Sequence, residues 1–358
     1  MYQSIASETC KFLTIKTTNM QSLNILLTTI DRDIQMILDF KETLGNRGKV
    51  FVGNSKMTNA LSYADEYTLT PLAKDDSYVD FLLTYCQANH ISAILPSRDI
   101  ELAVLAKNKK LFKKQGITLI LSDESAIQLC SDKWKTYQFL LSLGLKQPKS
   151  YIDLNFLKKD ILCGKISFPI FIKPRWGAGS RGIYQAYMSE ELDVLYQKSK
   201  KDIFNSAYNH EHKAEENACI IMQEKIEGVE HGLDVLNDLN GNYIATSTRR
   251  KYFMKSGISQ TVQIVDNKYF EDIGKLISSQ IKCIGPLSVD CFLTKTNEIV
   301  VLELNCRFGG EYTYTHLAGA NFPRQIVEWL LGKPTSNDNI TIKVGIKGAM
   351  ELGMPVRI

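Results

Sequence analysis

The chain has 358 residues, of which 44% are hydrophobic and 23% are charged, and its formal net charge is +4. Such values are typical of a globular protein with about two or three compact units. The basic residues are scattered along the chain and do not form the basic cluster expected of a nucleic-acid-binding protein. No apolar stretch is long enough to cross a membrane and the first twenty residues lack a signal-peptide core, so we expect a cytoplasmic protein without membrane contact. The eight cysteines contain no CxxC pair, which favours reduced core residues over a zinc site.

Residues 1–20 precede the first apolar segment and are expected to form a disordered leader. The next hundred residues alternate apolar runs with helical patterns, which predicts a parallel sheet flanked by helices. The expected strands are 23–28, 49–53, 66–69, 93–96 and 118–121, and the expected helices are 34–44, 78–89 and 100–115. The turn after the first strand has no GxGxxG, which disfavours a nicotinamide-dependent dehydrogenase.

From residue 123 the pattern changes to a long helical region, 123–143, followed by shorter strand-like runs. The expected strands are 170–173, 183–186, 218–223, 232–236, 243–248, 287–293, 299–302 and 341–346, and the expected helices are 269–283 and 321–331. This mixture adds an α+β part to the α/β part that precedes it.

The most informative segment is residues 299–310, Ile-Val-Val-Leu-Glu-Leu-Asn-Cys-Arg-Phe-Gly-Gly. Because side chains alternate along a strand, Glu303, Asn305 and Arg307 share one face. Leu302 and Leu304 are expected to point the other way, into a core. A carboxylate, an amide oxygen and a guanidinium on one face suit a site for a hard cation and anionic oxygens.

The preceding strand, 287–293, is expected to form a hairpin with this segment. With Lys295 facing Glu298 across the turn, Asp290 lies opposite Glu303. Mg²⁺ typically takes one or two carboxylates and completes its shell with phosphate oxygens and water, although an ordinary hairpin with a wet face remains an alternative. The metal ligands offered by this register are Asp290, Glu303 and Asn305. The residues expected on the apolar face are Val289, Cys291, Leu293, Leu302 and Leu304.

A second segment combines a lysine at a strand end, Lys173, with a loop containing Gly177, Gly179, Ser180 and Gly182. Glycines let backbone N–H groups approach phosphate oxygens, and the lysine adds a positive charge. The lysine precedes the glycines, so the segment is not a Walker A loop. Read alone, the pattern also fits a flexible hairpin loop.

A third segment runs from a strand into polar residues. The backbone of Glu224, Lys225 and Ile226 could imitate a base-pairing edge for adenine, and Glu230 could accept hydrogen bonds from ribose hydroxyls. A solvated strand end explains this pattern equally well.

Together these segments resemble the ATP-grasp superfamily, in particular the synthetase domains of the carbamoyl-phosphate synthetase large chain. The resemblance covers about residues 22–335, and its specific part is E-x-N-x-R-x-G-G with an acidic residue on the paired strand. It implies a Rossmann-like pre-ATP-grasp domain at 21–122, two ATP-grasp lobes at 123–225 and 226–335, and a C-terminal tail at 336–358.

The resemblance also implies roles for individual residues. Lys133 and Lys173 would contact the ATP phosphates, and Arg307 would act with Lys173 on the transferred phosphoryl group. The phosphate loop would be Gly177, Gly179, Ser180 and Gly182, the adenine and ribose contacts Glu224, Lys225, Ile226 and Glu230, and the Mg²⁺ or Mn²⁺ ligands Asp290, Glu303 and Asn305. Two departures are Cys306, where many relatives have proline, and Lys133, where the synthetase domains usually have arginine.

The implied activity is that of an ATP- and Mg²⁺-dependent ligase, which activates a small-molecule carboxylate as an acyl-phosphate and joins it to an amine such as an amino acid. A single module argues against synthesis of carbamoyl phosphate by this chain alone, since that enzyme has two. A carboxylate–thiol ligase, an acyl-phosphate-forming kinase and a nucleotide-binding regulatory subunit remain alternatives. The sequence does not set the oligomeric state, although homodimers are the commonest oligomers. Candidate substrate contacts are Arg249, Arg250 and Glu311, although a solvated basic turn also explains the two arginines.

Overall fold

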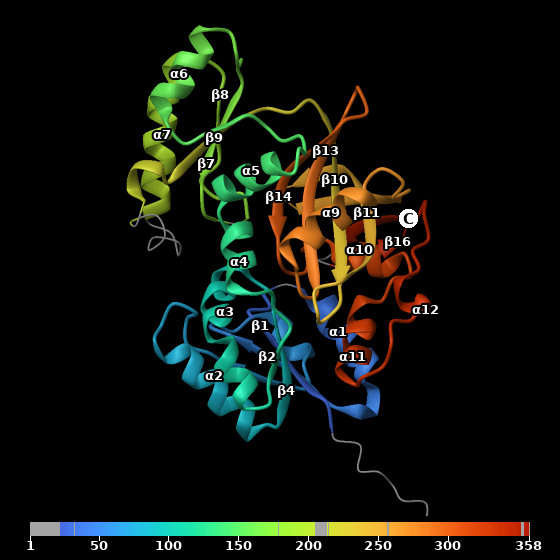
Figure 1. Cartoon of the computed structure of the whole chain (residues 1–358). Coiled ribbons are helices and arrows are strands. Elements are labelled where there is room, and N and C mark those ends of the chain that lie inside the picture. Colours follow the sequence, from blue (N-terminus) through green and yellow to red (C-terminus); the bar gives the residue numbers. More distant parts are fainter. Residues whose placement is uncertain are drawn as a thin grey trace, which may run out of the picture.

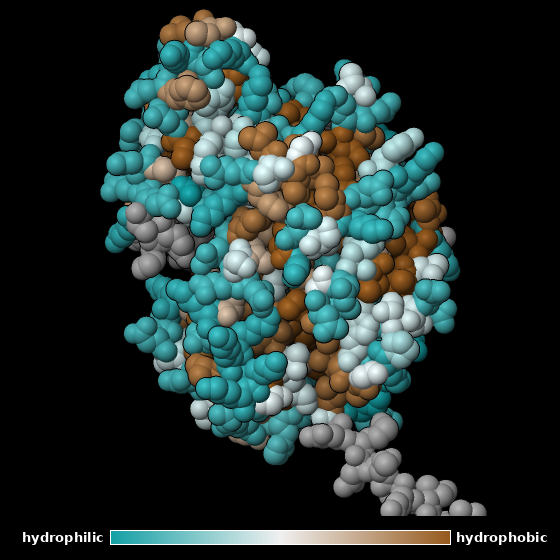
Figure 2. Space-filling model, in the orientation of Figure 1, coloured by the Kyte–Doolittle hydropathy of each residue, from teal (hydrophilic) through white to brown (hydrophobic). Residues whose placement is uncertain are grey.

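The computed structural model describes residues 22–31, 33–177, 179–204, 213, 215–255, 258–351 and 354–357. Three sheets organise this part of the chain, and the expected leader lies outside it (Figure 1). The visible face is mainly hydrophilic, with apolar residues in smaller groups between polar ones (Figure 2). No helix in the described ranges is long and apolar enough to span a membrane.

The first sheet is parallel, with the strand order β3-β2-β1-β4-β5, as the alternating pattern predicts. Alternate residues of β1 face opposite sides: Leu26 belongs to one core cluster, and Ile25 and Leu27 to another. The strands are β1 (Asn24–Thr28), β2 (Val50–Asn54), β3 (Glu66–Leu69), β4 (Ile91–Pro96) and β5 (Thr118–Leu119). The helices are α1 (Ile34–Leu44), α2 (Ser77–Ala88) and α3 (Asp99–Lys114), with 3₁₀ turns at Gly45–Arg47 and Asn59–Tyr63.

The helical region expected at 123–143 is two helices, α4 (Glu124–Ser131) and α5 (Lys133–Ser142). Asp132 separates them in an extended conformation, and its side chain accepts hydrogen bonds from the backbone N–H groups of Trp134 and Lys135. Because Asp is a preferred N-cap residue, it ends one helix and begins the next. The expected helical region is therefore present, but it consists of two helices.

The second sheet is antiparallel, with the order β6-β9-β7-β8, and forms the upper left part of Figure 1. Its core contains apolar residues of β7, β9 and the helix α7. The elements are β6 (Ser150–Tyr151), α6 (Leu154–Leu162), β7 (Ile170–Pro174), β8 (Tyr184–Ala186), α7 (Ser189–Phe204), a 3₁₀ turn at Glu216–Ala218 and β9 (Ile220–Glu224).

The third sheet has seven strands in the order β14-β13-β10-β11-β12-β15-β16. Its strands are β10 (Gly228–Asn237), β11 (Tyr243–Lys255), β12 (Ile258–Val265), β13 (Pro286–Thr294), β14 (Ile299–Asn305), β15 (Lys347–Glu351) and β16 (Met354–Arg357). Its helices are α9 (Glu271–Ile281), α10 (Tyr312–Leu317), α11 (Phe322–Leu330) and α12 (Asn337–Ile340). The strand expected at 341–346 was wrong, since β15 begins after it, and β12 was not expected. The mixed α/β and α+β architecture is confirmed, whereas the domain boundaries stay predictions.

The β13–β14 turn differs from the expected register by one residue. The backbone N–H of Thr294 donates to the carbonyl of Glu298 at 2.9 Å, so Thr294, and not Lys295, lies opposite Glu298. The loop therefore has three residues, and the last, Asn297, has a φ of 59°. Three-residue hairpin loops commonly end in such a left-handed residue, which asparagine tolerates.

A β-bulge restores the expected register beyond the turn. Cys291 pairs with Val301 but Asp290 pairs with Glu303, so Leu302 is the additional residue. Val301 is consequently fully buried and Leu302 only half-buried. The expected core position of Leu302 was wrong, while the pairing of Asp290 with Glu303 is as expected.

Candidate active site

The hairpin places the three expected metal ligands at one end of the large sheet. Asp290 pairs with Glu303, and Asn305 pairs with Ser288 on the same two strands. Asp290 keeps 25% of its side chain exposed, and Glu303 and Asn305 are half-buried. No three His, Cys, Asp or Glu side chains form a metal site within the described part of the chain. Two carboxylates and an amide nevertheless match the partial donor set with which proteins hold Mg²⁺ on a phosphate ligand.

Lys173, near the end of β7, faces these carboxylates from the second sheet. Its residue exposure is 6%, and burial lowers the pKa of its ammonium from 10.5 to about 8. Glu303 and Asp290 act in the opposite direction, whereas nearby Lys133 adds to the lowering of the pKa. Lys173 of the small sheet therefore faces two carboxylates of the large sheet, with Lys133 beside it.

Lys133, the first residue of α5, is connected to the glycine loop. Its Nζ donates to the carbonyl oxygen of Gly177 at 2.8 Å. Beside it, Arg175 donates from Nε and Nη2 to the two carboxylate oxygens of Asp132, both at 2.7 Å. Asp132 is also the cap of α5, so one buried ion pair fixes the start of this helix to the start of the loop. Sequence reasoning missed Arg175, although its position two residues after Lys173 was a usable signal.

The described loop residues have the backbone conformation that glycine favours. Gly177, Gly179 and Gly182 have φ values of 147°, 69° and 69°, and Ser180 has a φ of 56°. The carbonyl oxygen of Gly182 accepts a hydrogen bond from Ser199 of α7 at 2.8 Å. Successive residues with positive φ can present backbone N–H groups to an anion, as the predicted phosphate loop requires.

The expected adenine segment follows β9 directly. Glu224 Oε1 accepts a hydrogen bond from the backbone N–H of Lys149 at 2.8 Å, so this carboxylate connects two chain segments of the small sheet. Lys225 is exposed and forms an ion pair with Glu227, while Ile226 is half-buried. Glu230 lies further along, on β10, where its Oε1 accepts from Lys251 Nζ at 2.8 Å.

The candidate substrate residues do not lie together. Arg249 and Glu311 form a buried pair in which Arg249 Nε donates to Glu311 Oε2 at 2.9 Å. Arg249 also donates to the buried carboxylate of Asp234. Arg250, by contrast, is exposed, with its guanidinium 4.8 Å from the ring centroid of Tyr252. The structure thus separates Arg250 from the other two candidates.

The buried pair is electrostatically strong. Burial alone would raise the pKa of Glu311, but Arg249 and then Lys251 outweigh it and lower the pKa to about 2. Glu311 Oε1 also accepts a hydrogen bond from the backbone N–H of Ser259 at 3.0 Å. Both carboxylate oxygens therefore have partners, and the group stays ionised at neutral pH.

Two glycines make room for the Arg249 side chain. A Cβ on Gly232 would lie 2.8 Å from Arg249 Nη2, and one on Gly309 would lie 2.7 Å from Ser288 Oγ and 3.3 Å from the same Nη2. A Cβ on Gly310 would meet no atom within 4 Å. At Gly309 the close packing of Ser288 and Arg249 therefore requires a residue without a side chain. At Gly310 the packing imposes no such requirement.

Arg307 is held by the parallel-sheet domain. Its Nε and Nη2 donate to Asp99 Oδ1 and Oδ2 at 3.0 and 2.7 Å, a bidentate pair with the first residue of α3. Nη1 donates to the carbonyl of Phe308 at 2.9 Å. Sequence reasoning missed Asp99, which is 208 positions away and carries no local motif.

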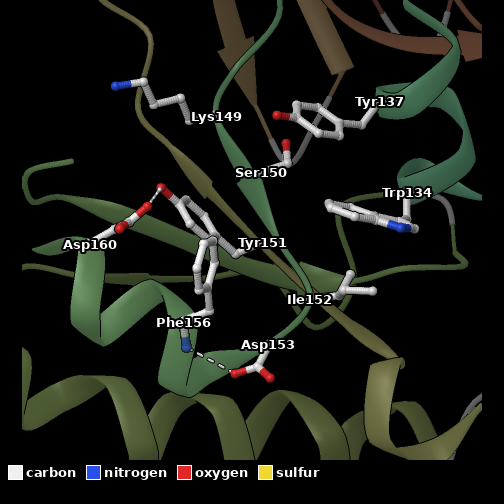
Figure 3. A pocket seen from close by; sticks show the side chains of 9 residues that line it. All are labelled: Trp134, Tyr137, Lys149, Ser150, Tyr151, Ile152, Asp153, Phe156 and Asp160. Atoms are coloured by element: carbon white, nitrogen blue, oxygen red, sulfur yellow. Dashed lines mark hydrogen bonds between the residues drawn. The ribbon is translucent and has the colours of Figure 1, made fainter. Parts of the chain in front are cut away.

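A cavity of about 520 Å³ lies elsewhere, between α5, β6 and α6 (Figure 3). Trp134 and Tyr137 stack on its one side with ring centroids 5.1 Å apart, and Tyr151 and Phe156 line another. None of the predicted site residues lines it. The lining residues are Trp134, Tyr137, Lys149, Ser150, Tyr151, Ile152, Asp153, Phe156 and Asp160.

Two family models match the chain. One is described as the PylC-like N-terminal domain and matches residues 25–120. The other is described as ATP-grasp in the biosynthetic pathway with Ter operon and matches residues 216–349. The second match contains the hairpin with Asp290 and Glu303.

Similar curated proteins include the carbamoyl phosphate synthase large chain of Haemophilus ducreyi, which is 26% identical over 231 residues. That match covers 60% of this chain, and the chain spans only 20% of the length of that relative. The D-alanine–D-alanine ligase of Fusobacterium nucleatum is 24% identical over 270 residues, covering 72% of this chain and 86% of the ligase.

Solved structures agree on the fold. Biotin carboxylase from Campylobacter jejuni aligns with a TM-score of 0.71 at 17% identity, covering 94% of this chain and 78% of that one. L-amino acid ligase from Bacillus licheniformis aligns with a TM-score of 0.68 at 18% identity, covering 92% and 79%. Family models, relatives and fold together support an ATP-grasp ligase as the kind of protein to which this chain is similar.

Proposed function

We propose that the chain is an ATP- and Mg²⁺-dependent ligase that activates a small-molecule carboxylate as an acyl-phosphate and joins it to an amine. The observation that carries this proposal is the meeting of Lys173 with Asp290 and Glu303 across two sheets. A buried lysine facing two carboxylates suits a metal–phosphate ligand, in which the lysine binds phosphate oxygens and the carboxylates bind the metal. The ligase names of several relatives support the same class of reaction.

In this proposal Asp290, Glu303 and Asn305 hold Mg²⁺. The ion would supply charge neutralisation at the phosphates, which is the usual contribution of Mg²⁺ to phosphoryl transfer. The donor set fits, because the carboxylates are partly exposed and are not fully consumed by protein hydrogen bonds. The readout that checks this assignment is Mn²⁺ binding in the presence of a nucleotide.

The cations of the site hold and orient the phosphates. Lys133 and the glycine loop are already connected through the Gly177 carbonyl, so both can close on a phosphate chain together. Lys173 adds a charge that is poorly hydrated because it is buried, and such a charge attracts an anion more strongly. Arg307 offers a planar guanidinium, which suits a phosphoryl group or a carboxylate in a bidentate contact.

At the acceptor end, Arg249 and Glu311 neutralise each other. We therefore propose that they form a fixed wall of the acceptor pocket and position its neighbours, while the exposed Arg250 does not contact the substrate. Because the chain covers only a fifth of the carbamoyl phosphate synthase relative, its substrates need not be those of that enzyme. Amino acids are the first class to test as carboxylate or amine.

The test measures phosphate release from Mg·ATP with a panel of amino acids and small carboxylates, each with and without amine partners. Release that requires one carboxylate–amine pair is the expected result and reveals both substrates. A protein with Glu303→Gln serves as the inactive control. Absence of ATP binding by calorimetry to the wild-type chain would refute the proposal.

A further inference from the structure

Lys251, on β11, contacts three carboxylates that belong to different parts of the site. Its Nζ donates to Glu230 Oε1 and to Asp290 Oδ1, both at 2.8 Å, and lies 3.7 Å from Glu311 Oε2. Only 5% of the Lys251 side chain is exposed, whereas Glu230 and Asp290 keep 27% and 25% exposure. The ammonium is therefore buried, whereas the two carboxylates that it joins remain partly exposed to solvent.

The sheet topology explains how one lysine reaches so far. β10 lies between β11 and β13, and Gly232 of β10 is the residue paired with Asp290. The space over Gly232 is taken by the guanidinium of Arg249, the neighbouring cation of β11. Lys251 joins Glu230 on β10 to Asp290 on β13, the next strand of the sheet.

The local charges are unbalanced. Two cations, Arg249 and Lys251, contact four carboxylates. Arg249 pairs with Asp234 and Glu311. Lys251 pairs with Glu230 and Asp290 and also lies near Glu311. The four carboxylates are Asp234, Glu311, Glu230 and Asp290. Within these contacts the carboxylates outnumber the cations, while Lys173 and Arg307 add positive charge that acts on Asp290. A divalent cation at Asp290 therefore meets several positive charges as well as the carboxylates.

We propose that Lys251 is the counter-ion that occupies Asp290 and Glu230 in the nucleotide-free protein and makes metal binding depend on the nucleotide. A metal ion alone must displace the ammonium from Asp290 and is repelled by it. A nucleotide brings phosphate charge that offsets this repulsion, and its ribose can take the place of the ammonium at Glu230. Lys251 then keeps Glu311 as a nearby partner. The inference rests on the proposed function, because it takes Asp290 as a metal ligand and Glu230 as the ribose acid.

The test titrates Mn²⁺ into the full chain with and without ADP and follows free Mn²⁺ by electron paramagnetic resonance. Removing one positive charge beside the metal should tighten Mn²⁺ binding without ADP by roughly tenfold or more in Lys251→Met, and should shrink the enhancement that ADP gives. Lys251→Gln should behave alike, and provides a polar neutral variant should the methionine variant not fold. Lys275→Met, on the exposed face of α9, should match the wild type.

A folded Lys251→Met or Lys251→Gln protein whose Mn²⁺ affinity without ADP is unchanged or weaker overturns the inference, since a purely structural lysine would give that result. The wild-type titration separates this failure from failure of the proposed function. If the wild type binds Mn²⁺ with ADP as expected, only the role of Lys251 is refuted. If the wild type binds neither ADP nor Mn²⁺ with ADP, both are refuted.

Discussion

Lys173→Met should make the nucleotide-free protein more stable, because the wild-type lysine is buried at an energetic cost. Burial lowers its pKa from 10.5 to about 8, despite the attraction of Glu303 and Asp290. One pKa unit corresponds to about 1.4 kcal/mol, so the charged form is disfavoured in the folded protein by roughly 3 kcal/mol. Methionine has a similar length and no charge. It should remove a large part of this cost and so raise the free energy of unfolding at neutral pH.

The stability difference between the wild type and Lys173→Met should depend on pH, which a change of packing alone would not produce. The folded pKa of Lys173 lies below its unfolded pKa, so both states are protonated below about pH 8 and the full cost is present there. Between about pH 8 and 10.5 the folded protein loses the proton first, and the cost disappears as pH rises. The stability advantage of Lys173→Met should therefore shrink across this range.

The assay is urea unfolding at about pH 7 and about pH 10, with Lys275→Met as a control for loss of an exposed lysine. Calorimetry with ADP should show weaker binding to Lys173→Met at every pH, and weaker binding to the wild type as pH rises through about 8. A less stable Lys173→Met protein at neutral pH, or a stability difference that does not change with pH, would refute the reasoning.

Three further changes test other parts of the site. Glu303→Gln should keep the fold, seen by circular dichroism, but abolish Mg²⁺-dependent turnover and ADP-dependent Mn²⁺ binding; wild-type-like activity would disprove the metal assignment. Asp99→Asn should lower the free energy of unfolding by about 1.5–3 kcal/mol, because it weakens a charged bidentate bond to Arg307; an unchanged urea midpoint would contradict this. Gly309→Ala should cost about 1–3 kcal/mol through the close contacts of its Cβ, whereas Gly310→Ala should be nearly neutral, and equal urea midpoints would show that the contacts relax without cost.

The hairpin shows how far sequence reasoning reaches. The hairpin register expected from the turn placed Asp290 opposite Glu303, and the structure has this pairing. The turn was one residue longer than expected. A bulge at Leu302 compensated for it, so the two differences cancelled at the site. Alternation fixes which face a side chain takes, but the sequence pattern does not show where a bulge lies.

Contacts between distant segments were beyond the reach of local patterns. The bidentate pair of Arg307 with Asp99 joins residues 208 positions apart, and it depends on how the parallel-sheet domain lies against the large sheet. The pair of Arg175 with Asp132 was closer to prediction, since Asp is a common N-cap and Arg175 follows Lys173. The α4–α5 break could have been predicted from Asp132, because an N-cap residue inside a helical pattern indicates a new helix start.

Three cations of the candidate site, Lys133, Lys251 and Arg307, each donate a hydrogen bond to an oxygen of the protein. Lys133 donates to the Gly177 carbonyl, Lys251 to Glu230 and Asp290, and Arg307 to Asp99. Binding a phosphate ligand therefore exchanges one set of oxygen partners for another, and does not simply add new ion pairs. Because the side chains of Lys251 and Arg307 are already largely removed from water, their contribution to the free energy of binding depends on the difference between the two sets of contacts. Removing a protein oxygen partner, as at Asp99, should thus change both stability and ligand affinity, and the two effects can oppose each other.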